Sequence, residues 1–71
     1  MTKTQIKEEA QAIVLAHGPS NCLEFLTEVV ERHSADWSLE EVAALKAEVE
    51  RQAVRVYRFL GFNPPGWVSN H

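Results

Sequence analysis

The strongest constraint in this sequence is an apolar stripe that repeats with helical spacing through residues 38–60. Its members fall at the a and d positions of successive heptads, three, four or seven residues apart, with two further apolar residues beside them. They are Val42, Leu45, Val49, Val56 and Phe59, flanked by Ala53 and Leu60. Gln52 occupies the remaining d position. Because this spacing places side chains along one side of an α-helix, the segment predicts a long amphipathic helix.

Both ends of this helix carry recognisable signals. Ser38 and Glu41 have the spacing of a capping box, in which each residue bonds the backbone N–H of the other. Gly61 follows the stripe and is the residue best suited to a left-handed helix end, with Phe62 placed to fold back on the last turn. The sequence therefore predicts a helix that starts after residue 38 and ends near residue 60.

A second helix is predicted over about residues 4–17. Thr2 or Thr4 can cap it, and Thr2 and Gln5 have capping-box spacing. The apolar positions inside the segment recur at helical spacing. Gly18 and Pro19 follow, and a proline at that point blocks continuation of the helix.

A third helix is predicted over about residues 20–33. Ser20 or Asn21 caps it, and Asn21 and Glu24 have capping-box spacing. The short link to the preceding helix favours an antiparallel helical hairpin. We therefore predict an all-α fold, a small three-helix domain in which this hairpin packs on the longer helix. The single domain spans residues 1–62, and residues 63–71, which contain two prolines and a glycine, form a short non-helical tail.

The unequal lengths of these helices bear on what covers the longest one. A helix of about 23 residues is roughly 35 Å long, whereas one of about 14 residues is roughly 20 Å long. A compact chain of this size is only about 30 Å across. A side-by-side hairpin would leave the C-terminal half of the long helix uncovered, unless the two shorter helices are staggered along it.

We expect this half to contact a second copy of the chain in a homodimer, with the tail contributing. Another protein is a further candidate partner. The residues expected at the contact are Val49, Val56, Phe59, Leu60, Phe62 and Trp67. Aromatic residues are favoured anchors in interfaces, and the alternative for Trp67 is that it covers the domain's own core.

The soft-ligand and nucleophile candidates are Cys22, His17 and His33. A zinc site needs three or four ligands at a recognisable spacing, which these residues do not provide. A nucleophilic Cys22 with His17 as its base would lack an orienting group and an oxyanion site. We therefore expect a buried cysteine and structural histidines, with no catalytic residue, no cofactor and no metal. With one cysteine, an intrachain disulfide is excluded.

The charge balance argues against nucleic acid as a partner. The net charge is −3, whereas nucleic-acid binding normally needs a basic footprint. Arg51, Arg55 and Arg58 nevertheless fall on one side of the long helix and are a candidate anion contact; the alternative is that they compensate the helix dipole and pair with nearby glutamates.

No apolar run reaches the ~20 residues of a membrane span, and the N-terminal segment has no apolar signal region. We expect a cytoplasmic protein without a membrane partner. The sequence favours a non-enzymatic protein–protein interaction module that self-associates. The alternative is a small DNA-binding regulator of the helix-turn-helix type, which three helices with short turns allow.

Overall fold

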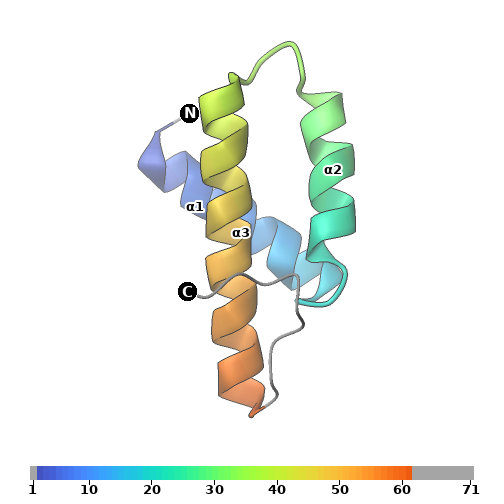
Figure 1. Ribbon diagram of the computed structural model, residues 1–71, viewed down its shortest axis with the longest axis vertical. Coiled ribbons are helices and arrows are strands. Elements are labelled where there is room, and N and C mark those ends of the chain that lie inside the picture. Colours follow the sequence, from blue (N-terminus) through green and yellow to red (C-terminus); the bar gives the residue numbers. More distant parts are fainter. Residues whose placement is uncertain (1, 62–71) are drawn as a thin grey trace.

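The computed structural model describes residues 2–61 and consists of three α-helices (Figure 1). They are α1 (Lys3–His17), α2 (Cys22–Arg32) and α3 (Leu39–Leu60). Residues 2–61 contain no β-strand. The predicted all-α, three-helix fold is confirmed, with helix ends that differ from the predicted ones by no more than two residues.

Two of the three predicted capping boxes are present, at the starts of α1 and α3. The Thr2 hydroxyl accepts a hydrogen bond from Gln5 N at 3.1 Å, and Thr2 N donates to Gln5 Oε1 at 2.8 Å. Ser38 and Glu41 make the same reciprocal pair at 3.2 and 3.1 Å. Each pair satisfies backbone N–H groups that the first helical turn leaves without a partner.

The capping box predicted at Asn21 and Glu24 is wrong. Asn21 precedes α2, but its side chain makes no capping hydrogen bond. Its backbone lies in the helical region, with φ −109° and ψ −6°, whereas a capping side chain normally needs an extended backbone to reach forward to the second or third N–H. The start of α2 therefore lacks the capping hydrogen bonds that stabilise the starts of α1 and α3.

α3 ends at the predicted glycine. Gly61 adopts the left-handed conformation with φ 79° and ψ 14°, and its N–H donates to the carbonyl of Arg58 at 3.1 Å. This geometry satisfies a carbonyl of the last turn, and glycine adopts it without the steric cost of a Cβ. The predicted contribution of Phe62 lies outside the described residues.

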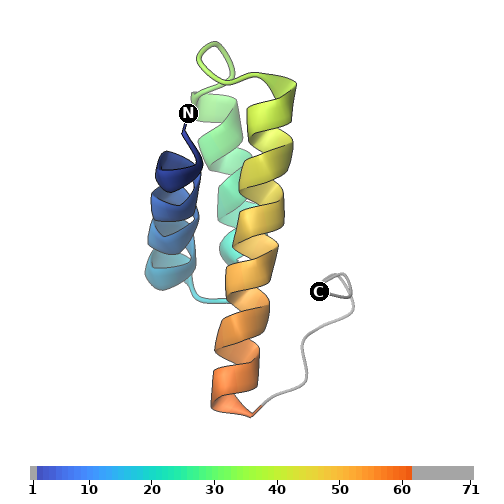
Figure 2. The same ribbon diagram turned by 90° about the vertical axis from the view of Figure 1, so that its left-hand side faces the viewer.

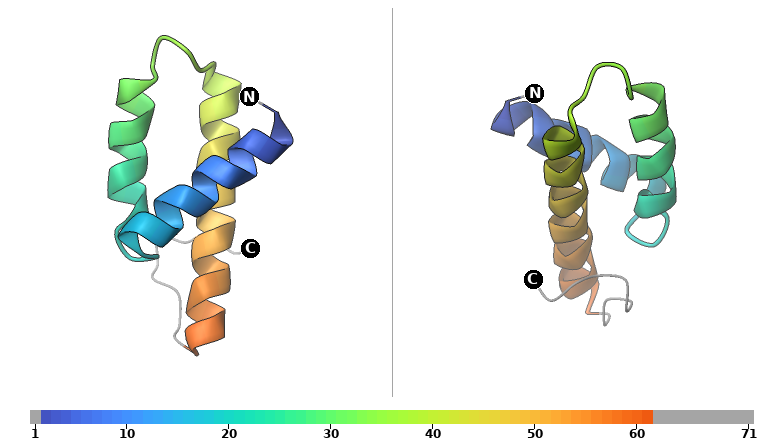
Figure 3. Two further views of the ribbon diagram at one scale, coloured as in Figure 1. Left: turned by 180° about the vertical axis from the view of Figure 1, so that it is seen from behind. Right: turned by 45° about the horizontal axis from the view of Figure 1, so that its top comes forward.

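The helices are arranged with α2 antiparallel to α3 and with α1 crossing the other two obliquely (Figures 1 and 3). The most extensive helix contact is the one between α1 and α3, and α2 packs against both. α1 therefore packs mainly on α3, and less on α2, with which it was predicted to form the hairpin.

The core lies where the three helices meet. It is formed by small and medium-sized apolar side chains that are at most 5% exposed. They are Ala10, Ile13, Val14, Cys22, Leu26, Leu45, Val49 and Ala53. Val54 is also buried but lies outside this cluster. The core is thus centred on the middle of α3.

α3 extends beyond the helices that cover it. The molecule measures 38 × 20 × 19 Å, and the last turns of α3 project past both α1 and α2 (Figure 2). The helix has 22 residues, against 15 in α1 and 11 in α2. The expectation that α3 is longer than its neighbours can cover is confirmed.

Within residues 2–61, none of the helices combines the length and the apolar character that crossing a membrane requires.

Candidate interaction surface

An apolar groove lies between the second half of α1 and the second half of α3, and it has a volume of about 340 Å³. Three residues of α1 and five of α3 line this α1–α3 groove. They are Gln11, Val14 and Leu15, and Gln52, Arg55, Val56, Phe59 and Leu60. The oblique crossing of α1 over α3 separates the helices toward the C-terminal end of α3 (Figure 3).

Three large apolar side chains beside this groove are exposed to solvent. The exposed fraction is 89% for Phe59, 75% for Leu15 and 54% for Leu60. Single apolar residues on a surface are ordinary, whereas contiguous apolar patches larger than a few hundred Å² are uncommon on monomers and mark interaction sites. Because these three residues come from two helices and line one groove, they form a patch rather than isolated exposures.

The structure brings together three of the residues predicted to contact a partner. Val56, Phe59 and Leu60 all line the α1–α3 groove. Val49 does not, and its assignment to an exposed contact is corrected: it is fully buried in the domain's own core. The two remaining predicted residues, Phe62 and Trp67, lie outside the described residues.

The α1 side of the groove was not predicted. Leu15 is the residue that matters most, since it is largely exposed and faces the same groove as Phe59. A signal was present in the sequence: Leu15 follows Ile13 and Val14 but falls outside the apolar stripe of its helix. A leucine outside the buried stripe of an amphipathic helix indicates a second apolar surface.

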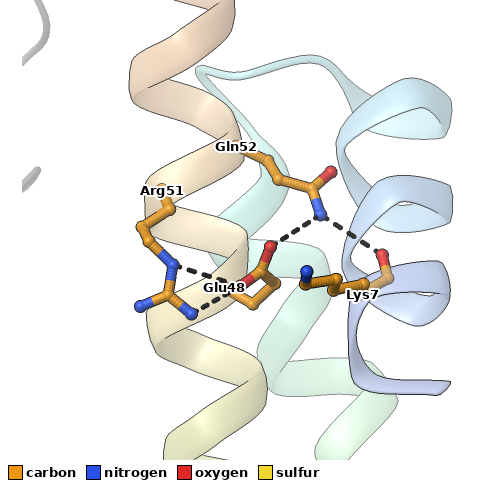
Figure 4. A network of polar contacts seen from close by, with 4 residues as sticks. All are labelled: Lys7, Glu48, Arg51 and Gln52. Atoms are coloured by element: carbon orange, nitrogen blue, oxygen red, sulfur yellow. Dashed lines mark hydrogen bonds and ion pairs between the residues drawn. The ribbon is translucent and has the colours of Figure 1, made fainter. Parts of the chain in front are cut away.

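A polar network joins α1 to α3 beside the groove (Figure 4). Gln52 Nε2 donates to the backbone carbonyl of Lys7 at 3.2 Å and to Glu48 Oε1 at 3.3 Å. Arg51 Nε donates to Glu48 Oε2 at 3.1 Å, and Arg51 Nη2 pairs with the same oxygen. The polar d position of the α3 stripe therefore holds the neighbouring helix by hydrogen bonds.

Glu48 is the buried charged residue of the described chain, with 7% of its surface exposed. The Arg51 guanidinium lowers the pKa of the Glu48 carboxyl, burial acts in the opposite direction, and the Gln52 amide lowers the pKa further. The carboxylate is thus held in its charged form by partners on its own helix.

The three arginines of the predicted anion contact do share one side of α3. Arg51, Arg55 and Arg58 line a hollow of about 200 Å³ together with Val54. Arg51 is already paired with Glu48. Arg55 lines both this hollow and the α1–α3 groove, so it places a positive charge at the edge of the apolar surface.

The cysteine is buried away from these surfaces. Cys22 is fully buried, its thiol lies 3.4 Å from the carbonyl oxygen of Pro19, and burial raises its pKa. His17, considered as its base, instead stacks on Phe25 with ring centroids 3.4 Å apart. A raised pKa disfavours the thiolate, the reactive form of cysteine.

His33 lies in the turn between α2 and α3. It stacks on Trp37 with ring centroids 4.5 Å apart, and its Nδ1 is 3.6 Å from an Asp36 carboxylate oxygen. No group of three or more metal-ligating side chains occurs among the residues that the structure describes.

Comparison of the chain with models of protein families, with curated proteins and with solved structures found no match in any of the three.

Proposed function

We propose that this domain is a non-enzymatic protein–protein interaction module that self-associates through the α1–α3 groove. The observation that carries the proposal is the exposure of Phe59, Leu15 and Leu60 around one groove. A homodimer is the smallest assembly that such self-association can form. A cytoplasmic location is part of the proposal, and it is supported by the free thiol of Cys22, which suits a reducing compartment.

The size of the patch sets the expected strength of the contact. Burying one large apolar side chain contributes about 1.5–3 kcal/mol, whereas association costs at least about 4 kcal/mol in lost translational and rotational freedom. Three such side chains are enough to offset that cost with a small surplus. We therefore expect a weak, concentration-dependent association rather than a permanent complex.

Sedimentation of the full chain across a concentration series tests the proposal. The wild type is expected to shift from monomer to larger species as the concentration rises. Phe59→Gln is expected to remain monomeric over the same range. Because Phe59 is 89% exposed, this change leaves the packing of the monomer nearly intact, which the helical circular dichroism signal checks.

Glu28→Gln is the matched control, since it changes an exposed side chain of α2, outside the groove lining. It is expected to self-associate like the wild type. A wild type that remains monomeric at high concentration, or a Phe59→Gln variant that associates normally, would remove the basis of the proposal.

A second candidate function is DNA binding, and the hollow lined by Arg51, Arg55 and Arg58 is the observation that favours it. The net charge of −3 and the exposed glutamates of α2 oppose it. Nonspecific DNA binding is electrostatic and strongest at low salt. A gel shift with random duplex at low salt therefore tests it, and the absence of a shift under those conditions would exclude this candidate.

A further inference from the structure

Both ends of α3 present a large apolar side chain to solvent. Leu39 is the first residue of the helix, and Phe59 is next to its last residue; each is 89% exposed. The helix runs along most of the length of the molecule (Figure 2), whose longest dimension is 38 Å. The two residues therefore belong to surfaces at opposite ends of the domain.

These two surfaces differ in charge. Close to Leu39 in the sequence are Asp36, whose side chain is 71% exposed, and the exposed Glu40; we call these three residues the acidic tip. At the other end, Arg55 is the charged residue among the described residues that line the α1–α3 groove. One end thus combines an apolar side chain with carboxylates, and the other combines apolar side chains with a guanidinium.

A second copy can fill the groove in two ways, with its own groove or with its acidic tip, and the charges favour the second. In a two-fold symmetric contact the same patch faces itself, so a groove-to-groove dimer brings Arg55 of one copy toward Arg55 of the other. Like charges at an interface cost free energy and suppress that pairing. The acidic tip offers Leu39 as an apolar anchor together with carboxylates that attract the guanidinium.

We propose that the acidic tip of one copy occupies the α1–α3 groove of another, with Leu39 against Leu15 and Phe59. Asp36 and Glu40 then lie near Arg55 of the receiving copy. This inference rests on the proposed self-association and adds the surface that enters the groove. Because the two contacting surfaces are different and lie at opposite ends of the molecule, copies join head to tail and form open chains or closed rings.

A mixing experiment with two single variants of the full chain tests this arrangement. Leu39→Gln damages the tip and leaves the groove intact, whereas Phe59→Gln damages the groove and leaves the tip intact. Each variant alone is expected to self-associate about tenfold or more weakly than the wild type. An equimolar mixture is expected to form a two-chain complex, because one intact tip meets one intact groove, and to stop at two chains.

The control Glu28→Gln is expected to form the same series of species as the wild type. If Phe59→Gln abolishes association but Leu39→Gln does not, the groove remains the self-association site and the acidic tip is overturned as its occupant. Loss in both variants without recovery in the mixture also overturns the head-to-tail arrangement.

Two results would overturn the inference together with the proposed function. One is unchanged association in both variants. The other is a wild type that stays monomeric while Phe59→Gln lowers its unfolding temperature, since the groove is then filled within its own chain.

Discussion

Val49 and Val56 are one heptad apart in the stripe of α3, yet the structure gives them different surroundings. Val49 is fully buried, whereas Val56 is partly buried at the α1–α3 groove. Replacing Val49 by alanine removes two carbon atoms that contribute about 0.8 kcal/mol each. A residual cavity of about 40 Å³ adds about 1 kcal/mol at roughly 24 cal/mol per Å³. We therefore expect Val49→Ala to lower the free energy of unfolding by about 2.5 kcal/mol.

Val56→Ala is the matched variant, and it is expected to cost less than about 1 kcal/mol in the monomer because part of the side chain is already solvated. Thermal unfolding followed by circular dichroism at low concentration measures both. For a domain of this size, Val49→Ala should lower the midpoint by about 10–20 °C. In sedimentation, Val56→Ala should also weaken self-association. Equal losses of stability in the two variants would refute the conclusion that Val49 is fully buried in the core whereas Val56 is only partly buried.

Three further predictions concern single groups. The pKa of Glu48 is lowered in the folded state. The ionised carboxylate therefore stabilises the fold fully above the ordinary carboxyl pKa of about 4.3, and this contribution is lost as pH falls through the folded pKa. Glu48→Gln should make the free energy of unfolding in urea less sensitive to pH in that range. Ser38→Ala should cost about 1 kcal/mol in urea unfolding, and Asn21→Ala clearly less, because Ser38 makes a capping hydrogen bond and Asn21 does not. The buried thiol of Cys22 should react with an aromatic disulfide reagent slowly in the native protein and rapidly in urea; fast native reaction would contradict its burial.

The accuracy of the sequence predictions depended on how local each signal was. The capping boxes at Thr2 and Ser38 were predictable because four consecutive residues contain both partners. The pattern at Asn21 has the same spacing but failed, since the backbone that enters α2 is already helical there. Spacing identifies the residues able to form a cap, but the direction from which the chain enters the helix decides whether the bond forms.

The periodic stripe of α3 shows the corresponding limit for packing and for the candidate site. Heptad spacing correctly placed Val49, Val56 and Phe59 on related positions of one helix, but their exposure depends on how far the neighbouring helices reach along it. That reach follows from the oblique crossing of α1, which is determined by side chains of both helices together (Figure 3). The same crossing brings Leu15 of α1 to the groove that Phe59 lines, so the α1 side of the groove was absent from any pattern within α3. A surface built from two helices is therefore predictable from sequence only once the angle between them is known.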